Sequence, residues 1–197
     1  MTSIYRLSLL ATVLCGLAST SQAGVFTYTV VLDGPSESPS NASPGIGSAV
    51  VTVNDTLFTM NVNVSFSGLT GTTTASHIHA ATAVANTGTA GVATQLPSFT
   101  GFPLGVTAGS MNQTYDMTLA SSYNPSYVTA NGGTTASAFS ALKAVMDAGK
   151  SYYNIHTSTF GGGEIRGFLT AAAPEPGTLA LVALGGMGLV VRRRRGK

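Results

Sequence analysis

Residues 57–66 read Leu-Phe-Thr-Met-Asn-Val-Asn-Val-Ser-Phe, and apolar side chains occupy every second position from Met60 to Phe66. Alternate side chains of an extended chain point to opposite faces, so this period predicts a strand with one buried face. The stretch 25–32, Val-Phe-Thr-Tyr-Thr-Val-Val-Leu, mixes apolar residues with threonine and is also typical of a strand. These two stretches set the expectation of a β-rich domain.

Working outward, short apolar or alternating runs recur between turn-rich segments. We expect further strands at 48–53, 75–81, 112–119, 152–157 and 164–171, with a shorter one at 92–96. A long loop is expected at 33–47, which contains three prolines. One helix is expected at 137–148, where four apolar side chains share a helical face and Gly149 follows as a C-cap. The pattern predicts an all-β fold, an antiparallel β-sandwich or barrel-like domain with one short helix.

The charge pattern of the chain excludes one large class of function. Charged residues make up 8% of the sequence, against roughly 25% in a typical soluble protein. Five of the nine basic residues lie after position 191, and the region 24–173 has three basic and six acidic side chains, a net charge of −3. A nucleic-acid-binding domain needs a basic patch to hold phosphates. We therefore expect no nucleic-acid partner.

The first 23 residues have the pattern of a secretory signal peptide. Arg6 supplies the positive charge, residues 7–17 are mainly apolar, and Ser21-Gln22-Ala23 places small residues at a cleavage site before Gly24. The apolar run is shorter than the ~20 residues that a membrane-spanning helix needs. The only cysteine, Cys15, falls within this segment, so cleavage by signal peptidase leaves no thiol for a disulfide or a thiolate metal site.

The C-terminus carries three elements in a fixed order. Pro174-Glu175-Pro176 comes first, an apolar segment at 178–191 follows, and Arg192-Arg193-Arg194-Arg195 closes the pattern. The apolar segment would be ~21 Å long as a helix, short of the ~30 Å of bilayer hydrocarbon. It favours a transient transmembrane helix, with the arginines on the cytoplasmic side. A plain tail anchor is the alternative.

This C-terminal pattern resembles the PEP-CTERM sorting signal of Gram-negative bacteria. The resemblance implies recognition by an exosortase, a membrane transpeptidase that removes the tail. The protein would be anchored transiently in the inner membrane and then passed to the outer envelope or the extracellular matrix. The expected organisation is a signal peptide at 1–23, a β domain at 24–171, and a sorting signal with a transmembrane helix at 172–197.

The β domain itself resembles the CHRD domain, named for its occurrence in chordin. The resemblance rests on His77-Ile78-His79-Ala80, on residues 152–157 (Tyr-Tyr-Asn-Ile-His-Thr), and on residues 162–169 (Gly-Gly-Glu-Ile-Arg-Gly-Phe-Leu). An upstream block from Leu32 to Val53 agrees in order, although the usual Glu-x-Pro-Pro reads Glu-Ser-Pro-Ser at 37–40. The family implies a fold and no established enzymatic activity.

All three histidines of the chain lie in alternating strand patterns. His77 and His79 are two residues apart and project to one face, and His156 follows the same alternation on its own strand. If the two strands are neighbours, three imidazoles converge and suit zinc or copper. The alternative is a structural polar network, with which we also associate Glu164, Arg166 and Asn154.

Two functional hypotheses follow. The first is an exported, non-catalytic envelope or matrix protein, without a cofactor, whose domain has a structural role or binds envelope polysaccharide or another protein. The second is a zinc- or copper-dependent protein, dismutase-like or redox-active, that uses His77, His79 and His156. The sequence lacks a Gly-x-Ser-x-Gly nucleophile motif and a closely spaced carboxylate pair in the domain. No catalytic residues are therefore assigned, and we expect the protein not to be an enzyme.

Overall fold

The computed structural model of the chain describes residues 24–172. The predicted signal peptide and the Pro-Glu-Pro, apolar and arginine elements of the sorting signal lie outside these residues. The strands are β1 (Val25–Asp33), β2 (Ile46–Asn54), β3 (Thr59–Ser67), β4 (Thr73–Ala80), β5 (Gly109–Asp116), β6 (Ser151–Thr157), β7 (Ile165–Phe168) and β8 (Thr170–Ala171). The helical elements are the 3-10 turn η1 (Ala120–Ser122), α1 (Pro125–Ala130) and α2 (Thr135–Asp147).

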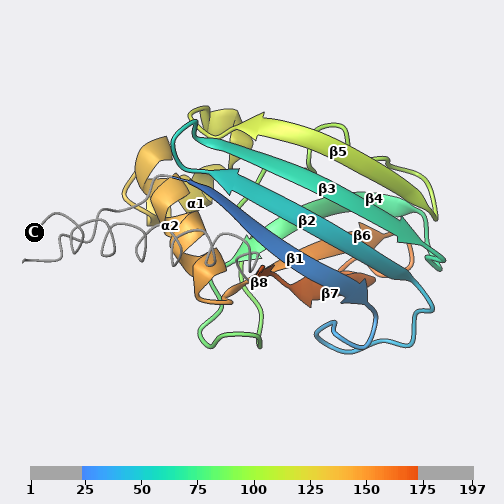
Figure 1. Cartoon of the computed structure of the whole chain (residues 1–197). Helices are drawn as coiled ribbons and strands as arrows, with labels where there is room; N and C mark the ends of the chain where they lie inside the picture. The colour runs from blue at the N-terminus through green and yellow to red at the C-terminus, as the bar shows by residue number, and fades with distance from the viewer. Residues whose placement is uncertain (1–23, 173–197) are drawn as a thin grey trace, which may run out of the picture.

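The strands form one antiparallel sheet in the order β4-β6-β7-β1-β2-β3-β5, and β8 also pairs with β1. Figure 1 shows the sheet curled over, with β4 and β6 lying behind β1, β2 and β3. β1, β2 and β3 are joined by full-length registers, with Val30 opposite Ala49 and Ala49 opposite Val64. The predicted fold class, an all-β antiparallel domain, is confirmed.

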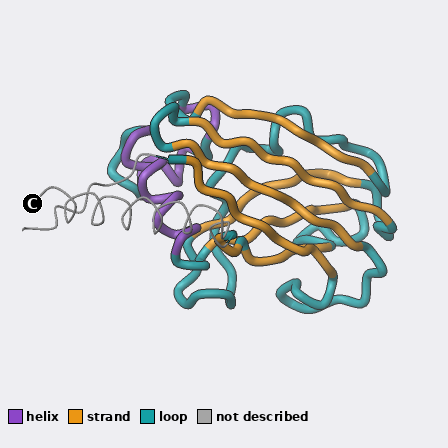
Figure 2. The backbone as a smooth tube through the Cα atoms, in the orientation of Figure 1, coloured by secondary structure: helices purple, strands orange, loops and turns teal. Residues whose placement is uncertain are grey.

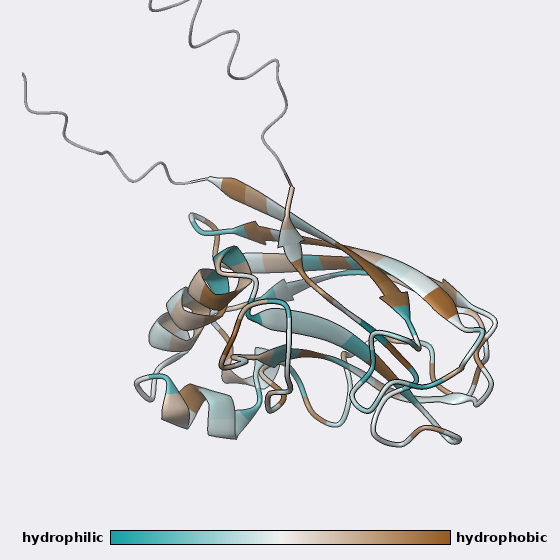
Figure 3. Cartoon of the chain, turned by 90° about the horizontal axis from the view of Figure 1, so that it is seen from below, coloured by the Kyte–Doolittle hydropathy of each residue, from teal (hydrophilic) through white to brown (hydrophobic). Residues whose placement is uncertain are grey.

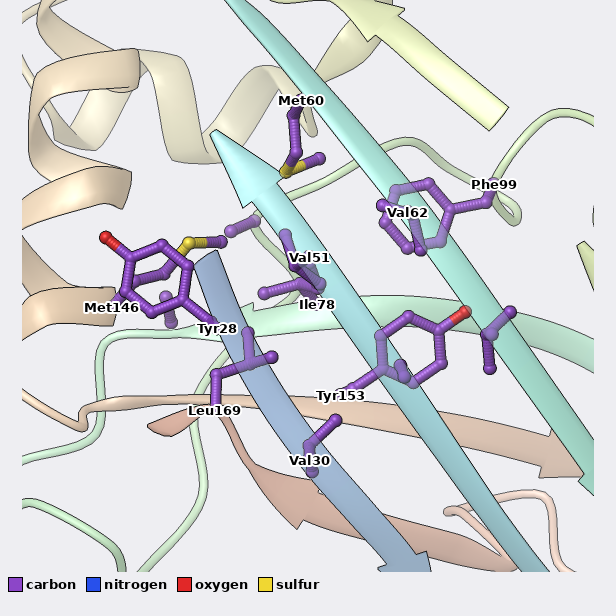
Figure 4. Close-up of a cluster of buried hydrophobic side chains, with 14 of the residues drawn as sticks. Tyr28, Val30, Val51, Met60, Val62, Ile78, Phe99, Met146, Tyr153 and Leu169 are labelled. Atoms are coloured by element: carbon purple, nitrogen blue, oxygen red, sulfur yellow. The ribbon is translucent and has the colours of Figure 1, made fainter. Parts of the chain in front are cut away.

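The hydrophobic core fills the space inside the curled sheet. In β3 the side chains of Met60, Val62, Val64 and Phe66 are buried, as the period of two predicts. Figure 4 shows residues of β1–β3 in one cluster with Ile78 of β4 and Tyr153 of β6. Figure 3 shows apolar stretches within the strands, whereas the loops are mostly pale or hydrophilic. Burial of these alternating faces is the main favourable term for the fold.

The helices gather at one end of the sheet (Figure 2). α2 begins with a capping box in which the side chains and backbones of Thr134 and Ser137 bond reciprocally. Its apolar face, which includes Phe139, Leu142 and Met146, is buried. The helix predicted at 137–148 corresponds to α2, and the structure adds the six-residue helix α1, which starts with Asn124 as N-cap and a proline in its first turn.

Three predicted strands differ from the structure. The strand predicted at 164–171 is divided into β7, which starts at Ile165, and β8. The segment 92–96 forms only isolated bridges, His79 with Val92 and Thr94 with Tyr123. The strand predicted at 112–119 is β5, which starts at Gly109 and ends at Asp116, where the chain turns toward η1. Among residues 24–172, no helix has the length and apolar character needed to cross a bilayer.

Candidate metal centre

The three histidines meet on the face of β4 and β6 that points away from the core. β4 and β6 pair antiparallel, with Ala75 opposite His156, His77 opposite Asn154, and His79 opposite Tyr152. Alternation sends Ile78 and Ile155 into the core and the imidazoles to the other face. The structure thus brings together the two strand motifs that lie more than seventy residues apart in sequence.

Loops that follow the strands cover this outer face. After β4 the chain folds back along the free edge of the strand, where Ala93 N–H bonds Ile78 O and Phe99 N–H bonds Ser76 O. His77 and His79 are consequently only 5% and 8% exposed, and His156 is half-buried. The imidazoles therefore lie in a largely dry setting, although they are on the outer face of the sheet.

The imidazole rings form a tight triangle. Ring centroids lie 5.2 Å apart for His77 and His156, 5.8 Å for His77 and His79, and 5.9 Å for His79 and His156. Each ring offers one nitrogen such that all three nitrogens lie within 4.8 Å of one another. Some point therefore lies within about 2.8 Å of all three atoms, against the ~2.0–2.1 Å of a zinc–imidazole bond. Side-chain shifts of less than about 1 Å would complete the coordination.

A backbone carbonyl fixes the proton on each ring. His77 Nε2 bonds Pro97 O at 2.7 Å, His79 Nδ1 bonds Ala90 O at 2.9 Å, and His156 Nδ1 bonds Gly161 O at 3.0 Å. A carbonyl oxygen only accepts, so the bonded nitrogen carries the hydrogen of the neutral ring. The lone pair is then on the other nitrogen, which is the state of a metal-ligating histidine.

The remaining nitrogens, one from each ring, have no protein partner. His77 Nδ1, His79 Nε2 and His156 Nε2 are buried, each with less than 1 Å² accessible to solvent, and none has a hydrogen-bond partner among the described residues. A buried polar atom without a partner costs about 1–3 kcal/mol. Three such acceptors in one cluster are a strong reason to expect a ligand there.

Burial lowers the pKa of all three imidazoles. The pKa of His79 falls to about 4, chiefly through burial and, to a smaller extent, through the charges of the other two rings and of Arg166. The carbonyl bonds oppose this effect but do not cancel it. The rings are therefore neutral near pH 7, and a metal ion would not have to displace protons from them.

An aromatic and cationic stack lies beside the triad. The ring of Tyr152 is parallel to that of His79 at 4.7 Å, and its hydroxyl donates to Ala90 O, the same carbonyl that accepts from His79. Arg166 lies 4.8 Å from the centre of the Tyr152 ring and donates to Ser36 O and Gly88 O. Arg166 thus fastens two loops over the outer face of the sheet.

The residues predicted as one polar network are divided between separate environments. Arg166 pairs with Glu37, at 3.7 Å between Nε and Oε2, and not with Glu164. Burial raises the pKa of Glu37 to about 7, although the charge of Arg166 opposes this rise. Asn154 is buried between His77 and Arg166 in the register, and its Oδ1 has no hydrogen-bond partner within the described region. Sequence reasoning noted Glu37 only as part of a loop motif.

Glu164 organises a second, independent cluster at the end of β6. It is fully buried. Its Oε1 accepts from Ser43 Oγ and the Thr70 N–H, and its Oε2 accepts from Thr157 Oγ1 at 2.6 Å and the Gly71 N–H at 3.1 Å. Burial raises the pKa of Glu164, but these four hydrogen bonds outweigh it and leave that pKa below its ordinary value. The cluster ties three loops to the sheet.

Comparison with protein-family models identifies the family to which this chain is related. A protein-family model for the CHRD domain matches residues 28–169 and so covers most of the sheet, the triad and the Glu164 cluster. The chain belongs to the CHRD domain family. A second model, the PEP-CTERM protein-sorting motif, matches residues 172–195 and starts directly after β8. No match was found among curated proteins or solved structures.

The two matches establish the export and sorting of this CHRD protein. A PEP-CTERM motif marks a protein that is exported, processed by an exosortase and sorted to the cell surface, so these predictions are confirmed. Neither CHRD nor PEP-CTERM is an enzymatic family. The predicted transmembrane helix, on which the membrane-anchoring step depends, lies after residue 172 and so outside the described residues.

Proposed function

We propose that this surface-sorted CHRD protein binds one zinc or copper ion through His77, His79 and His156. Two observations carry the proposal: each ring offers one nitrogen within 4.8 Å of the other two, and each ring keeps one buried nitrogen without a hydrogen-bond partner within residues 24–172. Zinc and copper are among the ions for which imidazole is a well-suited ligand. The site would hold the ion from two strands that are rigidly paired to each other.

The surroundings support ligation more than a purely structural role. A histidine that only stabilises the fold needs its donor and its acceptor satisfied by protein or water. Here the N–H of every ring donates to a backbone carbonyl, whereas the acceptor nitrogen of every ring is buried without a donor among the described residues. Carbonyl bonds to the distal nitrogens are the usual way in which proteins orient metal-binding imidazoles.

Metal analysis of the full-length chain, purified in mild detergent and dialysed after loading, tests the proposal. We expect about one zinc or copper ion per chain in the wild type and none in the His77→Ala/His79→Ala/His156→Ala variant. Asn63→Ala, which truncates an exposed polar side chain of β3, serves as the control and should retain the ion. Absence of stoichiometric metal from the loaded wild type would refute the proposal.

A second function, binding of a neutral envelope polysaccharide, is favoured by the outer face of β2, β3 and β5. The register aligns uncharged side chains in rows across these strands, Ser48-Ser65-Ser110 and Thr52-Asn61-Thr114. The hydroxyl and amide groups of these uncharged rows are able to exchange hydrogen bonds with sugar hydroxyls. Co-sedimentation of the full-length chain with envelope polysaccharide tests this, and Asn63→Asp should weaken the binding. Equal binding by wild type and variant would exclude this face.

A further inference from the structure

We infer that the three-histidine centre selects monovalent copper, Cu(I), over divalent zinc. The inference rests on the proposed function, because it concerns the ion that His77, His79 and His156 would hold. The charge of the ligand set, the charges around it and the number of ligands that the fold supplies all favour Cu(I).

The ligand set carries no negative charge. Within residues 24–172, the cluster that can hold an ion consists of three histidines, without an aspartate, glutamate or cysteine. Neutral imidazoles do not neutralise any of the charge of a bound ion. A divalent ion would therefore keep a net charge of +2 in the site and a monovalent ion +1.

The surroundings add more positive than negative charge. Arg166 is buried, stacks on Tyr152 and exerts a positive potential at His79. The ion-pair partner of this guanidinium, Glu37, lies 3.7 Å from it, and one of the Glu37 oxygens has no hydrogen-bond partner within residues 24–172. Burial raises the pKa of the Glu37 carboxyl to about 7, so near neutral pH this group carries less than a full negative charge. The counter-charge available to an ion at the triad is small.

Burial makes the charge of the ion decisive. The cost of moving an ion from water into a protein interior rises with the square of its charge, so a divalent ion costs about four times as much as a monovalent ion of equal size. The coordinating nitrogens each have less than 1 Å² accessible to solvent, which leaves little screening by water. Electrostatics at this site therefore favour a +1 ion.

The number of ligands points in the same direction. Zinc in proteins is almost always four-coordinate, and sites with three protein ligands keep a water molecule in the fourth position. Divalent copper favours tetragonal geometry, which also needs at least four ligands. Cu(I) has a filled d shell and is stable with three ligands in a trigonal arrangement. A triangle of buried imidazoles from two paired strands, with every other ring nitrogen engaged by a carbonyl, matches that arrangement.

Competition titrations of the full-length chain distinguish the ions. Under oxygen-free conditions, Cu(I) and Zn(II) are each delivered from a chromophoric chelator of known affinity. We expect one Cu(I) per chain, bound at least about a hundredfold more tightly than Zn(II). Silver(I), a monovalent ion that does not change oxidation state under these conditions, should bind with the same stoichiometry and compete with Cu(I).

A single substitution at the half-buried ligand tests the charge argument. His156→Asp replaces a neutral ligand by an anionic one, so the preference for Cu(I) over Zn(II) should fall by at least about tenfold. Wild-type protein that binds one Zn(II) as tightly as Cu(I), or more tightly, would overturn this inference while the proposed metal site stands. Wild-type protein that retains neither ion would overturn both.

Discussion

Glu164 offers a direct test of how the fold is held together, through the substitution Glu164→Gln. The carboxylate is fully buried, and each of its oxygens accepts one backbone N–H and one hydroxyl. Glutamine has nearly the same shape but replaces one oxygen with an NH₂ group. Whichever oxygen is replaced, one N–H and one hydroxyl then face a donor instead of an acceptor.

The structure sets the size of the effect. The backbone N–H that loses its acceptor cannot turn away, and a buried unpaired donor costs about 1–3 kcal/mol. The hydroxyl cannot adapt freely either, because Ser43 Oγ already accepts from Gly45 N–H and Thr157 Oγ1 from Phe160 N–H. The two bonds to the remaining oxygen also weaken, because this oxygen is neutral in glutamine. We therefore expect a total loss of about 3–4 kcal/mol, from a typical free energy of unfolding of ~5–15 kcal/mol.

Urea unfolding followed by circular dichroism at pH 7 and pH 3 measures this loss. Because the pKa of Glu164 in the folded state lies below its ordinary value of 4.5, its contribution is present above pH 4.5 and lost as the pH falls through the folded-state pKa. The gap between wild type and Glu164→Gln should therefore narrow at pH 3. Asp33→Asn, which keeps an acceptor for the exposed bond from Ser36 N–H, is the control. A difference below about 0.5 kcal/mol at pH 7 would show that the reasoning on Glu164 is wrong.

Three further predictions follow from separate features. Glu37→Gln should raise the free energy of unfolding by up to about 3 kcal/mol at pH 8 and leave it unchanged at pH 4. The folded-state pKa of Glu37 is raised to about 7, so the carboxyl contributes fully to stability below its unfolded-state pKa and loses that contribution as the pH rises through 7. Urea unfolding midpoints at the two pH values check this. Gly167→Ala should cost about 3 kcal/mol or more, because a Cβ there would overlap the backbone oxygen of Val31 on the neighbouring strand; an unchanged melting temperature would contradict this. Metal at about 100 times its dissociation constant should stabilise the wild type by about 2.7 kcal/mol, which raises the melting temperature by roughly 5–10 °C. The same metal concentration should leave the melting temperature of a variant without the three histidines unchanged.

Strand periodicity explains why much of the fold is predictable from the sequence. Met60, Val62 and Val64 alternate with asparagine, so a buried face and an exposed face follow from the residues alone. The helix α2 is predictable for the same reason, at a period of 3.6. Helix α1 is not, because its six residues contain too few apolar positions for a period to show. The order of strands in the sheet also has no local signal, since β4 and β6 come together only through the tertiary fold.

The polar clusters show the same limit at the level of single residues. Glu164 and Arg166 are two positions apart, and alternation places both on one face of a strand. β7, however, begins only at Ile165, and the irregular turn before it directs Glu164 toward Ser43 and Thr157. Arg166, inside the strand, meets Glu37 from a loop that is more than a hundred residues away in sequence. Local alternation does not predict partners that loops supply.

For the histidine centre, the strand face of each imidazole is predictable from the sequence, whereas the direction of its lone pair is not. Alternation alone predicts that His77 and His79 share one face of their strand, and that His156 lies on the face of its own strand opposite Ile155. What separates a metal ligand from a structural histidine is the direction of the lone pair, and here backbone carbonyls of three residues set it: Ala90, Pro97 and Gly161. Carbonyl oxygens are present at every residue and leave no side-chain signature. The choice between ligation and a structural network therefore depends on loop positions that only the folded chain reveals, and those positions favour ligation.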